Sequence, residues 1–449
     1  MSIAGILFII LFFVIAFIGN KSKNDIAFRL LLLTVSTSIF INIGTAVLNL
    51  SYICICEYLL LIFMFLYFVT SSKSIRKIKR NFLIPAVVLL LCILVGDVHL
   101  ILSNRNPEVI PFTTRIDSVY HSELSTSTAS FSDSNIAYIR WMLIFILIVY
   151  FSTKVLDNDE RKEKFLFSLK TIFELFFILW TFEWIVNNIV SPTFIRDIVY
   201  YLFGVNDTSK TYDVILRWGF YGFNGLFTEP SYITVMIVYY CIMWKFKLQN
   251  VRDWIILIWS IIILIINGST SGAMLIPMGI FILLKNSSKI NKKTVEIIMC
   301  ILFAGIILAI RFAGSISSFY DQVSLYLNAY LTGGTFMSRG ETSAAIRKYG
   351  NDIAYSAFLK RPLFGVGLGT TRGYGILPGS LACLGLIGTL SYLYFLGKAY
   401  TCKINKDNVI LLILVLLYST TILSVWYLYY PLIIPICIVM TFKTEWINS

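Results

Sequence analysis

One polar segment of an otherwise apolar chain carries more basic than acidic side chains. Residues 314–376 carry six Lys and Arg against three Asp and Glu. A guanidinium group donates paired hydrogen bonds to phosphate oxygens and stays charged at any relevant pH. The basic excess therefore favours binding of a phosphate or a diphosphate. The basic residues are Arg339, Arg347, Lys348, Lys360, Arg361 and Arg372, and the acidic ones are Asp321, Glu341 and Asp352.

A second candidate for chemistry is Glu229, in the sequence GLFTEPSY, directly before the apolar run ITVMIVYYCIMW. Two interpretations stay open. In the first, the motif only starts a helix: Thr228 caps it, Pro230 fits its first turn and Glu229 complements its dipole. In the second, Glu229 acts as a general base or orients an arginine such as Arg217. In both, the proline fixes the start of the helix that carries the carboxylate.

Apolar stretches of membrane length surround these polar segments. Of the residues, 58% are hydrophobic and 14% charged, and the mean hydropathy is +0.81. Runs of about 20 apolar residues, the length that crosses a hydrocarbon core, recur along the chain. We predict an all-α integral membrane protein, a polytopic bundle of about 13 (roughly 12–14) transmembrane helices with a large, partly helical external loop. The predicted spans are 2–19, 26–49, 52–70, 82–102, 137–153, 165–190, 231–244, 254–267, 272–284, 295–313, 377–397, 408–424 and 429–442.

The distribution of Lys and Arg predicts how the spans are oriented. The net charge of +13 does not indicate nucleic-acid binding, because basic residues cluster in short connections such as 71–81, which holds five. With that connection in the cytoplasm, alternation places 103–136, 191–230 and 314–376 outside. The Ser/Thr-rich 103–136 is expected to be loosely structured. We predict one membrane domain over 1–449, with its first span retained, its N-terminus outside and its C-terminus inside.

The longest external segment contains a predicted helix. In GETSAAIRKYGNDIAYSAFLKRP, apolar residues recur at helical spacing and Pro362 ends the pattern. We predict an amphipathic helix that rests on the bundle or on the membrane surface. Its apolar positions are Ile346, Tyr349, Ile353 and Ala357, and its polar positions are Arg347, Lys348, Asn351 and Asp352.

The cysteines and histidines indicate no metal or disulfide chemistry. The eight cysteines lie in or near apolar spans and form no CxxC pair, and only His99 and His121 occur. We therefore predict no disulfide framework, no metal site and no cofactor.

Charged residues also occur within the predicted spans. Lys170 and Glu174 are four residues apart, and we expect them to neutralise each other on one helix. The sequence pattern does not explain Glu57, Asp97 and Arg140. Intramembrane charges of this kind are candidates for function.

Two motifs carry a resemblance to a known family. GLFTEPSY resembles the G-L-F-x-E-P-S segment of bacterial O-antigen and exopolysaccharide repeat-unit polymerases, the Wzy group. RPLFGVGLGTT (361–371) resembles the P-hydrophobic-x-G-V-G-x-G segment that closes the large periplasmic loop in the polymerase and O-antigen ligase superfamily. Arg339 and Gly350 are separated by ten residues, similar to the R-x10-G pattern of a polymerase loop. The resemblance covers roughly 225–375, in a shared order and on one predicted side of the membrane.

The chain departs from this superfamily at several positions. NGSTSGAM (267–274) resembles its short external turn, but Thr270 stands where ligases usually carry an arginine. The loop 314–376 has no histidine, whereas ligases typically use one there. The companion R-x15-G pattern is absent, because Ile233 stands sixteen residues after Arg217. The ligase-specific departures favour a polymerase and leave the general base open among Glu229 and the acidic residues of the loop.

The resemblance implies an inverting, metal-independent glycosyl transfer between two undecaprenyl-diphosphate-linked oligosaccharides at the periplasmic face of the bacterial inner (cytoplasmic) membrane. The growing chain is the donor, and a hydroxyl of the incoming repeat unit attacks it. Membrane lipids, a chain-length regulator and a flippase of the same pathway are the other implied partners. The candidate catalytic residues are Glu229 and Arg339, the diphosphate-binding candidates are Arg217, Arg339, Arg347 and Arg361, and the loop-shaping candidates are Gly350, Gly365 and Gly367.

Three other functions remain as alternatives. A lipid-linked oligosaccharide flippase, a transporter, would place its basic residues in a central cavity of the bundle and not in an external loop. An O-antigen ligase would use lipid A core as its acceptor. A cell-wall glycosyltransferase of the shape, elongation and division type would need a catalytic aspartate in a large loop, for which Asp321 and Asp352 are candidates.

Overall fold

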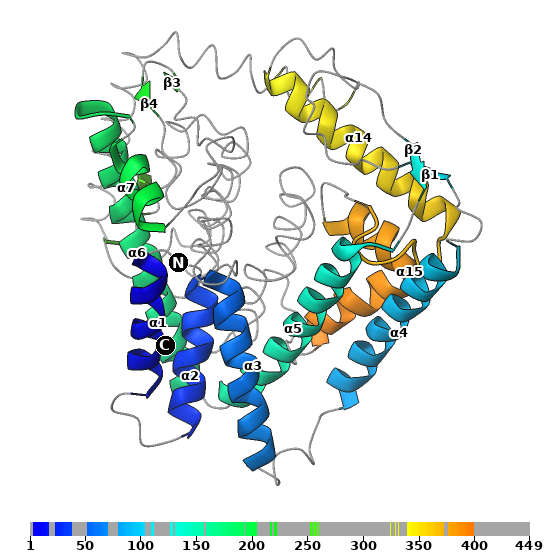
Figure 1. Cartoon of the computed structure of the whole chain (residues 1–449), viewed down its shortest axis with the longest axis horizontal. Helices are drawn as coiled ribbons and strands as arrows, with labels where there is room; N and C mark the ends of the chain where they lie inside the picture. The colour runs from blue at the N-terminus through cyan, green and yellow to red at the C-terminus, as the bar shows by residue number, and fades with distance from the viewer. Residues whose placement is uncertain are drawn as a thin grey trace, which may run out of the picture. The chain divides into compact units, whose positions relative to one another are not determined.

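The described part of the chain is mostly helical, with two short hairpins (Figure 1). A computed structural model provides its coordinates. It divides into two compact units: unit 1 comprises 1–74, 151–319 and 444–449, and unit 2 comprises 75–150 and 320–443. The single membrane domain predicted above stays a prediction. The structure describes residues 3–17, 23–37, 52–70, 80–103, 109–111, 126–128, 131–156, 159–192, 194–203, 216–217, 220–221, 252–253, 255–256, 258–259, 324, 328, 331, 339–371 and 376–398.

Unit 1 is built around a long helix, α6, and the shorter helices beside it. Helix α2 contacts α1, α3 and α6, and α7 contacts α1 and α6. Strands β3 and β4 pair antiparallel, with Arg217 opposite Phe220. The elements are α1 (Ile3–Phe17), α2 (Lys23–Ser36), α3 (Tyr52–Thr70), α6 (Asp159–Ile189), α7 (Phe194–Phe203), β3 (Leu216–Arg217) and β4 (Phe220–Tyr221).

Two charges on α6 are neutralised by a neighbouring segment and not by each other. Lys170 donates to the carboxylate of Asp253, and Arg252 donates to the carboxylate of Glu174. The local Lys170–Glu174 pair expected from the sequence is therefore wrong. Its spacing allowed a pair along one helix, but acidic and basic side chains more than seventy residues away bind both groups.

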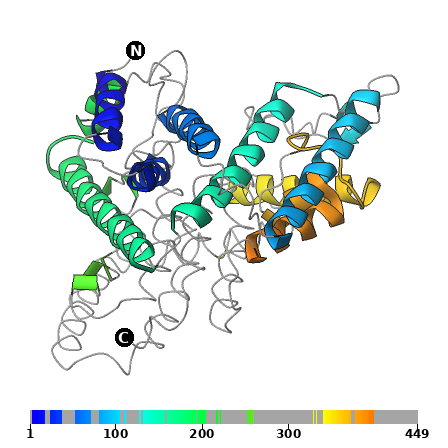
Figure 2. The same cartoon turned by 90° about the horizontal axis from the view of Figure 1, so that it is seen from below.

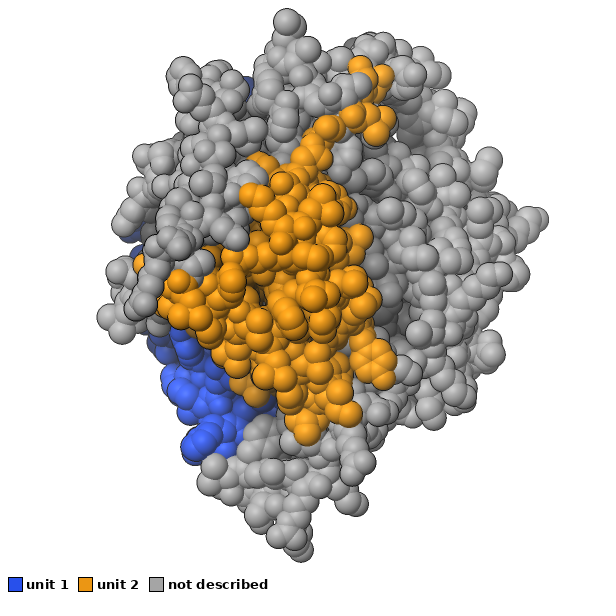
Figure 3. All heavy atoms as spheres, turned by 90° about the vertical axis from the view of Figure 1, so that its right-hand side faces the viewer, with its two compact units in different colours: residues 1–74, 151–319, 444–449 blue, residues 75–150, 320–443 orange. Residues whose placement is uncertain are grey.

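The described part of unit 2 contains four helices and one hairpin. Helix α15 packs against α4 and α14, and both views show α4 and α15 side by side (Figures 1 and 2). Figure 3 shows one face of this unit. The Ser/Thr-rich stretch between α4 and α5 contains the antiparallel pair β1–β2, with Val109 opposite Thr128. The elements are α4 (Arg80–Ser103), β1 (Val109–Pro111), β2 (Thr126–Thr128), α5 (Asp133–Val155, shared at its end with unit 1), α14 (Arg339–Lys360) and α15 (Ile376–Lys398).

Three described helices are long and apolar enough to cross a membrane: Leu83–Leu102, Glu160–Ile189 and Leu377–Tyr394. Shorter apolar helices cover Ile3–Val14, Ile55–Leu66 and Asn135–Leu147. All six stretches overlap predicted spans, and the bundle of about 13 spans stays a prediction. The predicted spans 231–244, 272–284, 295–313, 408–424 and 429–442 lie outside the described residues, as do the second half of 26–49 and most of 254–267.

Helix α14 occupies the segment where the sequence predicts an amphipathic helix. Ile353 and Ala357 are buried as expected. Asn351 is also buried, at 5% exposure, although the pattern assigns it to the polar face, and Leu359 is 75% exposed. The polar/apolar division of this helix is therefore less regular than predicted.

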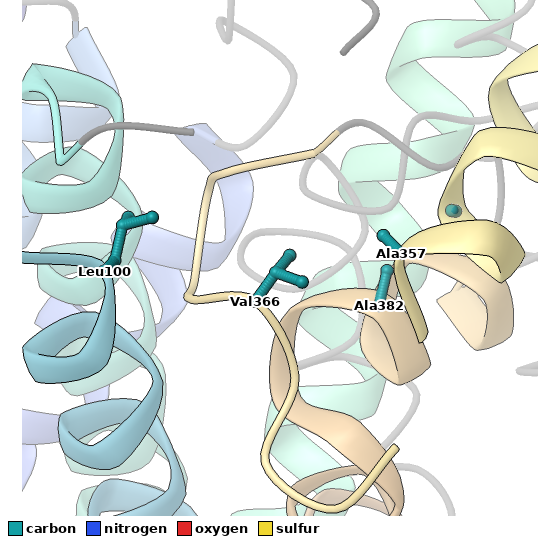
Figure 4. Packing of buried hydrophobic residues seen from close by; sticks show 5 residues of the cluster. Leu100, Ala357, Val366 and Ala382 are labelled. Atoms are coloured by element: carbon teal, nitrogen blue, oxygen red, sulfur yellow. The ribbon is translucent and has the colours of Figure 1, made fainter. Parts of the chain in front are cut away.

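A buried apolar cluster joins four parts of unit 2. It contains Leu100 of α4, Ala354 and Ala357 of α14, Val366 between α14 and α15, and Ala382 of α15, with Phe131 packed against it. Figure 4 shows Val366, which follows α14, lying between Leu100 and the two alanines Ala357 and Ala382. Alanines allow helix backbones to approach closely, which suits packing within a membrane.

Candidate functional site

The residues from 361 to 371, the motif RPLFGVGLGTT, form an irregular segment between α14 and α15, which we call the 361–371 segment. Arg361 N still donates to Ala357 O (3.3 Å) and Phe358 O (3.0 Å), so the helical turn closes there. Pro362 has no N–H to continue the helix and disfavours helical geometry in the residue before it. The chain then turns, and Gly365 N donates to Arg361 O at 3.1 Å.

Helix α15 is interrupted at Gly385, which has φ 66° and ψ −172°. The 361–371 segment binds the backbone groups around this break. Leu386 N donates to Pro362 O (2.7 Å), and Ile387 N donates to Leu363 O (3.2 Å). From the other side, Val366 N donates to Ala382 O at 2.9 Å. The break lies within Leu377–Tyr394, a helix that is long and apolar enough to cross a membrane. Lipid would offer no partners to backbone groups at such a break, and these bonds supply them.

Glycines allow the two backbones to cross in direct contact. A Cβ atom on Gly365 would lie 2.4 Å from the carbonyl carbon of Cys383. A Cβ on Gly385 would lie 2.4 Å from the carbonyl carbon of Leu363. Both glycines also have positive φ, 74° and 66°, which side-chain-bearing residues rarely adopt. The crossing therefore requires glycine at both positions.

Two side chains bind the backbone N–H and the backbone C=O of Leu368. Leu368 N donates to Asp97 Oδ1 of α4 at 3.1 Å, and Asn135 Nδ2 of α5 donates to Leu368 O at 2.8 Å. Asn135 Nδ2 also donates to Thr370 Oγ1 at 3.0 Å. We call the pair Asp97 and Asn135 the Leu368 clamp. It ties the segment to two helices at once.

The orientation of the Asn135 carboxamide is fixed by its other contacts. Its Oδ1 accepts hydrogen bonds from Ser132 N (2.9 Å) and Ser132 Oγ (3.0 Å), at the position that precedes α5. With two bonds accepted and two donated, the carboxamide has all its hydrogen-bonding capacity in use. Asn135 therefore serves both as part of the helix cap and as half of the clamp.

The Asp97 carboxylate lies against the turn of the segment. Its side chain is 4% exposed, and its Oδ2 accepts no hydrogen bond from the described residues. A Cβ on Gly367, which has φ 101°, would lie only 2.9 Å from Asp97 Oδ1. A Cβ on Gly96 would lie 3.2 Å from the Gly367 backbone. Glycine on both sides thus lets the carboxylate reach the peptide of Leu368.

The structure separates the arginines predicted to bind one diphosphate. Arg339 is the first residue of α14 and Arg347 lies inside it, about 12 Å further along at 1.5 Å per residue. Arg361 follows the other end of α14, about 33 Å from Arg339 along the helix. A single diphosphate cannot contact both ends of this helix. Arg217 lies in β3 of unit 1.

The other predicted site residues occupy different environments. Glu229, Asp321 and Thr270 lie outside the described residues. Gly350 lies inside α14, where it is buried, and not in a turn. Asp352 accepts a bond from Lys348 at 3.2 Å on the exposed side of the helix. Among the described residues, no group of three or more His, Cys, Asp or Glu could hold a metal ion.

Sequence reasoning did not identify the Leu368 clamp. Asp97 gave a signal, because a carboxylate within an apolar span requires a partner. Asn135 gave none, since it follows a stretch rich in Ser and Thr where asparagine is unremarkable. Comparison with family models, curated proteins and solved structures finds no match for this chain.

Proposed function

We propose that this protein is a membrane-embedded glycosyltransferase that polymerises undecaprenyl-diphosphate-linked oligosaccharide repeat units. In this proposal the chain crosses the bacterial inner membrane about 13 times, and its loop 314–376 faces the periplasm. The support comes from the order of the GLFTEPSY and RPLFGVGLGTT motifs and from the apolar helices of membrane length.

The observation that carries the proposal is the construction of the 361–371 segment. The motif that resembles the polymerase superfamily is the stretch that binds the break in α15. The segment thereby joins α14, with its basic residues, to two helices of membrane length. An enzyme that acts on lipid-linked sugars needs such a rigid join, because the reacting groups must be held at a fixed height above the lipid.

In the proposed reaction, a hydroxyl oxygen of the incoming repeat unit attacks the anomeric carbon of the growing chain. The bond from that carbon to the diphosphate oxygen breaks, and its electrons leave with the diphosphate. The hydroxyl proton passes to a base, for which Glu229 is our candidate. Negative charge grows on the leaving diphosphate, so cationic donors stabilise the transition state most.

Arg339 is the preferred donor to the leaving diphosphate. As the first residue of α14, it lies where backbone N–H groups have no partner within the helix and where the dipole favours anions. Arg347 is near enough along the helix to assist. Arg361 is at the far end of α14, and we assign it no role on the same diphosphate.

One observation, the break in α15, supports a second candidate function. Discontinuous membrane helices are a feature of transporters, so the protein would then be a transporter of lipid-linked oligosaccharides. In transporters such breaks leave backbone groups for the substrate or for ions. Here Leu386 N, Ile387 N and Ala382 O are bound by the 361–371 segment. This difference favours the enzyme.

Gel analysis of lipopolysaccharide from a host strain that lacks the protein tests the proposal. A core that bears a single repeat unit would indicate a lost polymerase. Absence of all O-antigen would indicate a lost transporter or ligase and would contradict the proposal.

Arg339→Lys tests the assignment of the leaving-group donor. Lysine keeps the charge but loses the paired donors, and removal of one preorganised donor typically costs about 2.7–4 kcal/mol, roughly a hundred- to a thousandfold in rate. Polymer formed by purified protein from lipid-linked repeat units is the measurement. Lys348→Arg, on the same helix, is the matched control and should have little effect, since Lys348 pairs with Asp352. Equal rates for Arg339→Lys and wild type would refute the assignment.

The same assay tests independence from metal ions. We expect polymerisation to continue in excess EDTA, because cationic side chains and not a metal are proposed to stabilise the diphosphate. Activity that disappears in EDTA and returns with magnesium or manganese would contradict this mechanism.

A further inference from the structure

Asp97 and Asn135 take no part in the reaction proposed above, yet their side chains are buried, at 4% and 0% exposure. They come from two different helices and bind the N–H and the C=O of the same residue, Leu368. Buried polar groups are costly unless they are hydrogen-bonded. The two side chains therefore replace the partners that a regular strand or helix would give this peptide.

We propose that Asp97 and Asn135 are positioning residues, which hold Leu368 and thereby keep the 361–371 segment seated on the break in α15. The inference rests on the proposed function only for its activity readout. Its structural readout is independent of any substrate.

The geometry favours positioning by a hydrogen-bond acceptor and not chemistry by a carboxylate. Asp97 Oδ1 is occupied by Leu368 N, and the side chain is enclosed by the segment and α4. An asparagine at position 97 offers the same acceptor oxygen without the charge. A proton-transfer role would need the charge, whereas the clamp needs only the oxygen.

Asn135 has two roles, in the helix cap of α5 and in the Leu368 clamp, and one substitution can separate them. An aspartate at position 135 keeps both acceptor oxygens, so the bonds from Ser132 that start α5 survive. It loses the donor to Leu368 O and Thr370 Oγ1. It also brings a second carboxylate next to Asp97. Asn135→Asp thus removes the clamp while it preserves the helix cap.

The reactivity of a native cysteine, Cys383, can show whether the 361–371 segment is packed against α15. Cys383 is fully buried beneath the segment, and its Sγ lies 3.6 Å from Thr371 O. If the segment lifts from α15, this thiol becomes accessible. Cys92 of α4, which lies against Gly388 of α15, and Cys56 of unit 1 are buried elsewhere and serve as internal references.

The experiment compares wild type, Asp97→Asn, Asp97→Leu and Asn135→Asp as full-length purified protein. N-ethylmaleimide labelling of each cysteine is followed by peptide mass spectrometry, and polymerisation is assayed in parallel. We expect Cys383 to label about tenfold faster or more in Asp97→Leu and Asn135→Asp, because each leaves a buried peptide group unsatisfied. Cys56 and Cys92 should stay protected. Asp97→Asn should match wild type in labelling and in polymer.

Protection of Cys383 in both Asp97→Leu and Asn135→Asp would overturn the proposal. Loss of polymer in Asp97→Asn with Cys383 still protected would also overturn it, because Asp97 would then act through its charge. If Asp97→Leu exposes all three cysteines, it has unfolded, and Asn135→Asp decides. A wild-type protein that makes no polymer would refute the proposed function, and the labelling would still decide the clamp.

Discussion

In both units side chains bind the N–H and the C=O of a single residue outside the helices, but the number of side chains differs. In unit 1, the carboxamide of Asn188 on α6 accepts from Tyr221 N (2.8 Å) and donates to Tyr221 O (2.9 Å). In unit 2, the same two bonds to Leu368 come from Asp97 and Asn135 on separate helices. One side chain joins a hairpin to one helix, whereas two join a segment to a pair of helices.

The units also differ in how they satisfy buried polar groups. Unit 1 pairs charges between α6 and residues 252–253. Unit 2 uses side-chain bonds to backbone and a direct crossing of two backbones at Gly365 and Gly385. Charge pairs can be replaced by apolar side chains of similar volume, but a crossing of backbones has no substitute. We therefore expect unit 2 to tolerate change at these positions less well than unit 1.

The largest effect is expected from Gly385→Ala in unit 2. The new methyl group would lie 2.4 Å from backbone atoms of Leu363, at a residue with positive φ. Since neither backbone can move without breaking the bonds across α15, we expect a loss of at least about 4 kcal/mol of stability. Thermal unfolding in detergent and the membrane level measure it. Leu386→Ala, which removes an exposed side chain next to it, is the control. Equal melting of the two variants would contradict the crossing.

The next effect concerns the charge pairs of unit 1. Lys170→Met leaves the carboxylate of Asp253 buried without its lysine, which typically costs about 3–5 kcal/mol. The double variant Lys170→Met/Asp253→Leu should recover most of this loss, because no charge remains buried. Thermal unfolding of the four proteins in a double-mutant cycle measures the coupling. A double variant as unstable as the single one would show that the pair is not the source of the effect.

The pair of hydrogen bonds between Asn188 and Tyr221 in unit 1 should contribute less to stability than the Leu368 clamp of unit 2. Asn188→Asp keeps the acceptor for Tyr221 N and loses the donor to Tyr221 O. We expect a loss of about 1–3 kcal/mol, confined to the hairpin β3–β4, because an unsatisfied carbonyl remains. Hydrogen exchange of residues 216–221, compared with exchange in α15, measures the confinement. Faster exchange in both places would mean that the two clamps are not independent.

The smallest effect is expected at the start of α5. Ser132→Ala removes the hydroxyl bond to Asn135 Oδ1 but keeps the bond from the backbone N–H. We expect about 0.5–1.5 kcal/mol, in the range of a single net hydrogen bond. Thermal unfolding measures it, with Asn135→Asp as the reference variant. A larger loss for Ser132→Ala than for Asn135→Asp would assign the main role of Asn135 to the helix cap.

The sequence predicts well those features that depend on neighbours along the chain. The apolar runs predict the helices α3, α4 and α15 to within a few residues, because a hydrocarbon span requires a fixed length. The spacing of Ile353 and Ala357 predicts the buried face of α14, and Pro362 predicts its end. Each of these signals is local.

The candidate site depends on contacts that no local pattern contains. Asp97 and Asn135 meet Leu368 across 271 and 233 residues of sequence. The partner of Lys170 lies 83 residues away, so the nearer Glu174 was the wrong partner to predict. The break at Gly385 is also hidden, since LACLGLIGTL reads as a continuous apolar helix. Glycine is common in membrane helices, and only the crossing with Gly365 distinguishes this one.

The break in α15 has a consequence for the order in which the chain is assembled during synthesis. Its missing bonds come from Pro362 and Leu363, which leave the ribosome just before the helix they complete. Because lipid offers no substitute for these bonds, we expect the segment and the helix to enter the membrane together, as one hairpin-like unit. Helices α4 and α5 are made earlier, and chains generally fold from the N-terminal end. We therefore expect Asp97 and Asn135 to be in place before the 361–371 segment, whose Leu368 they bind, has been synthesised.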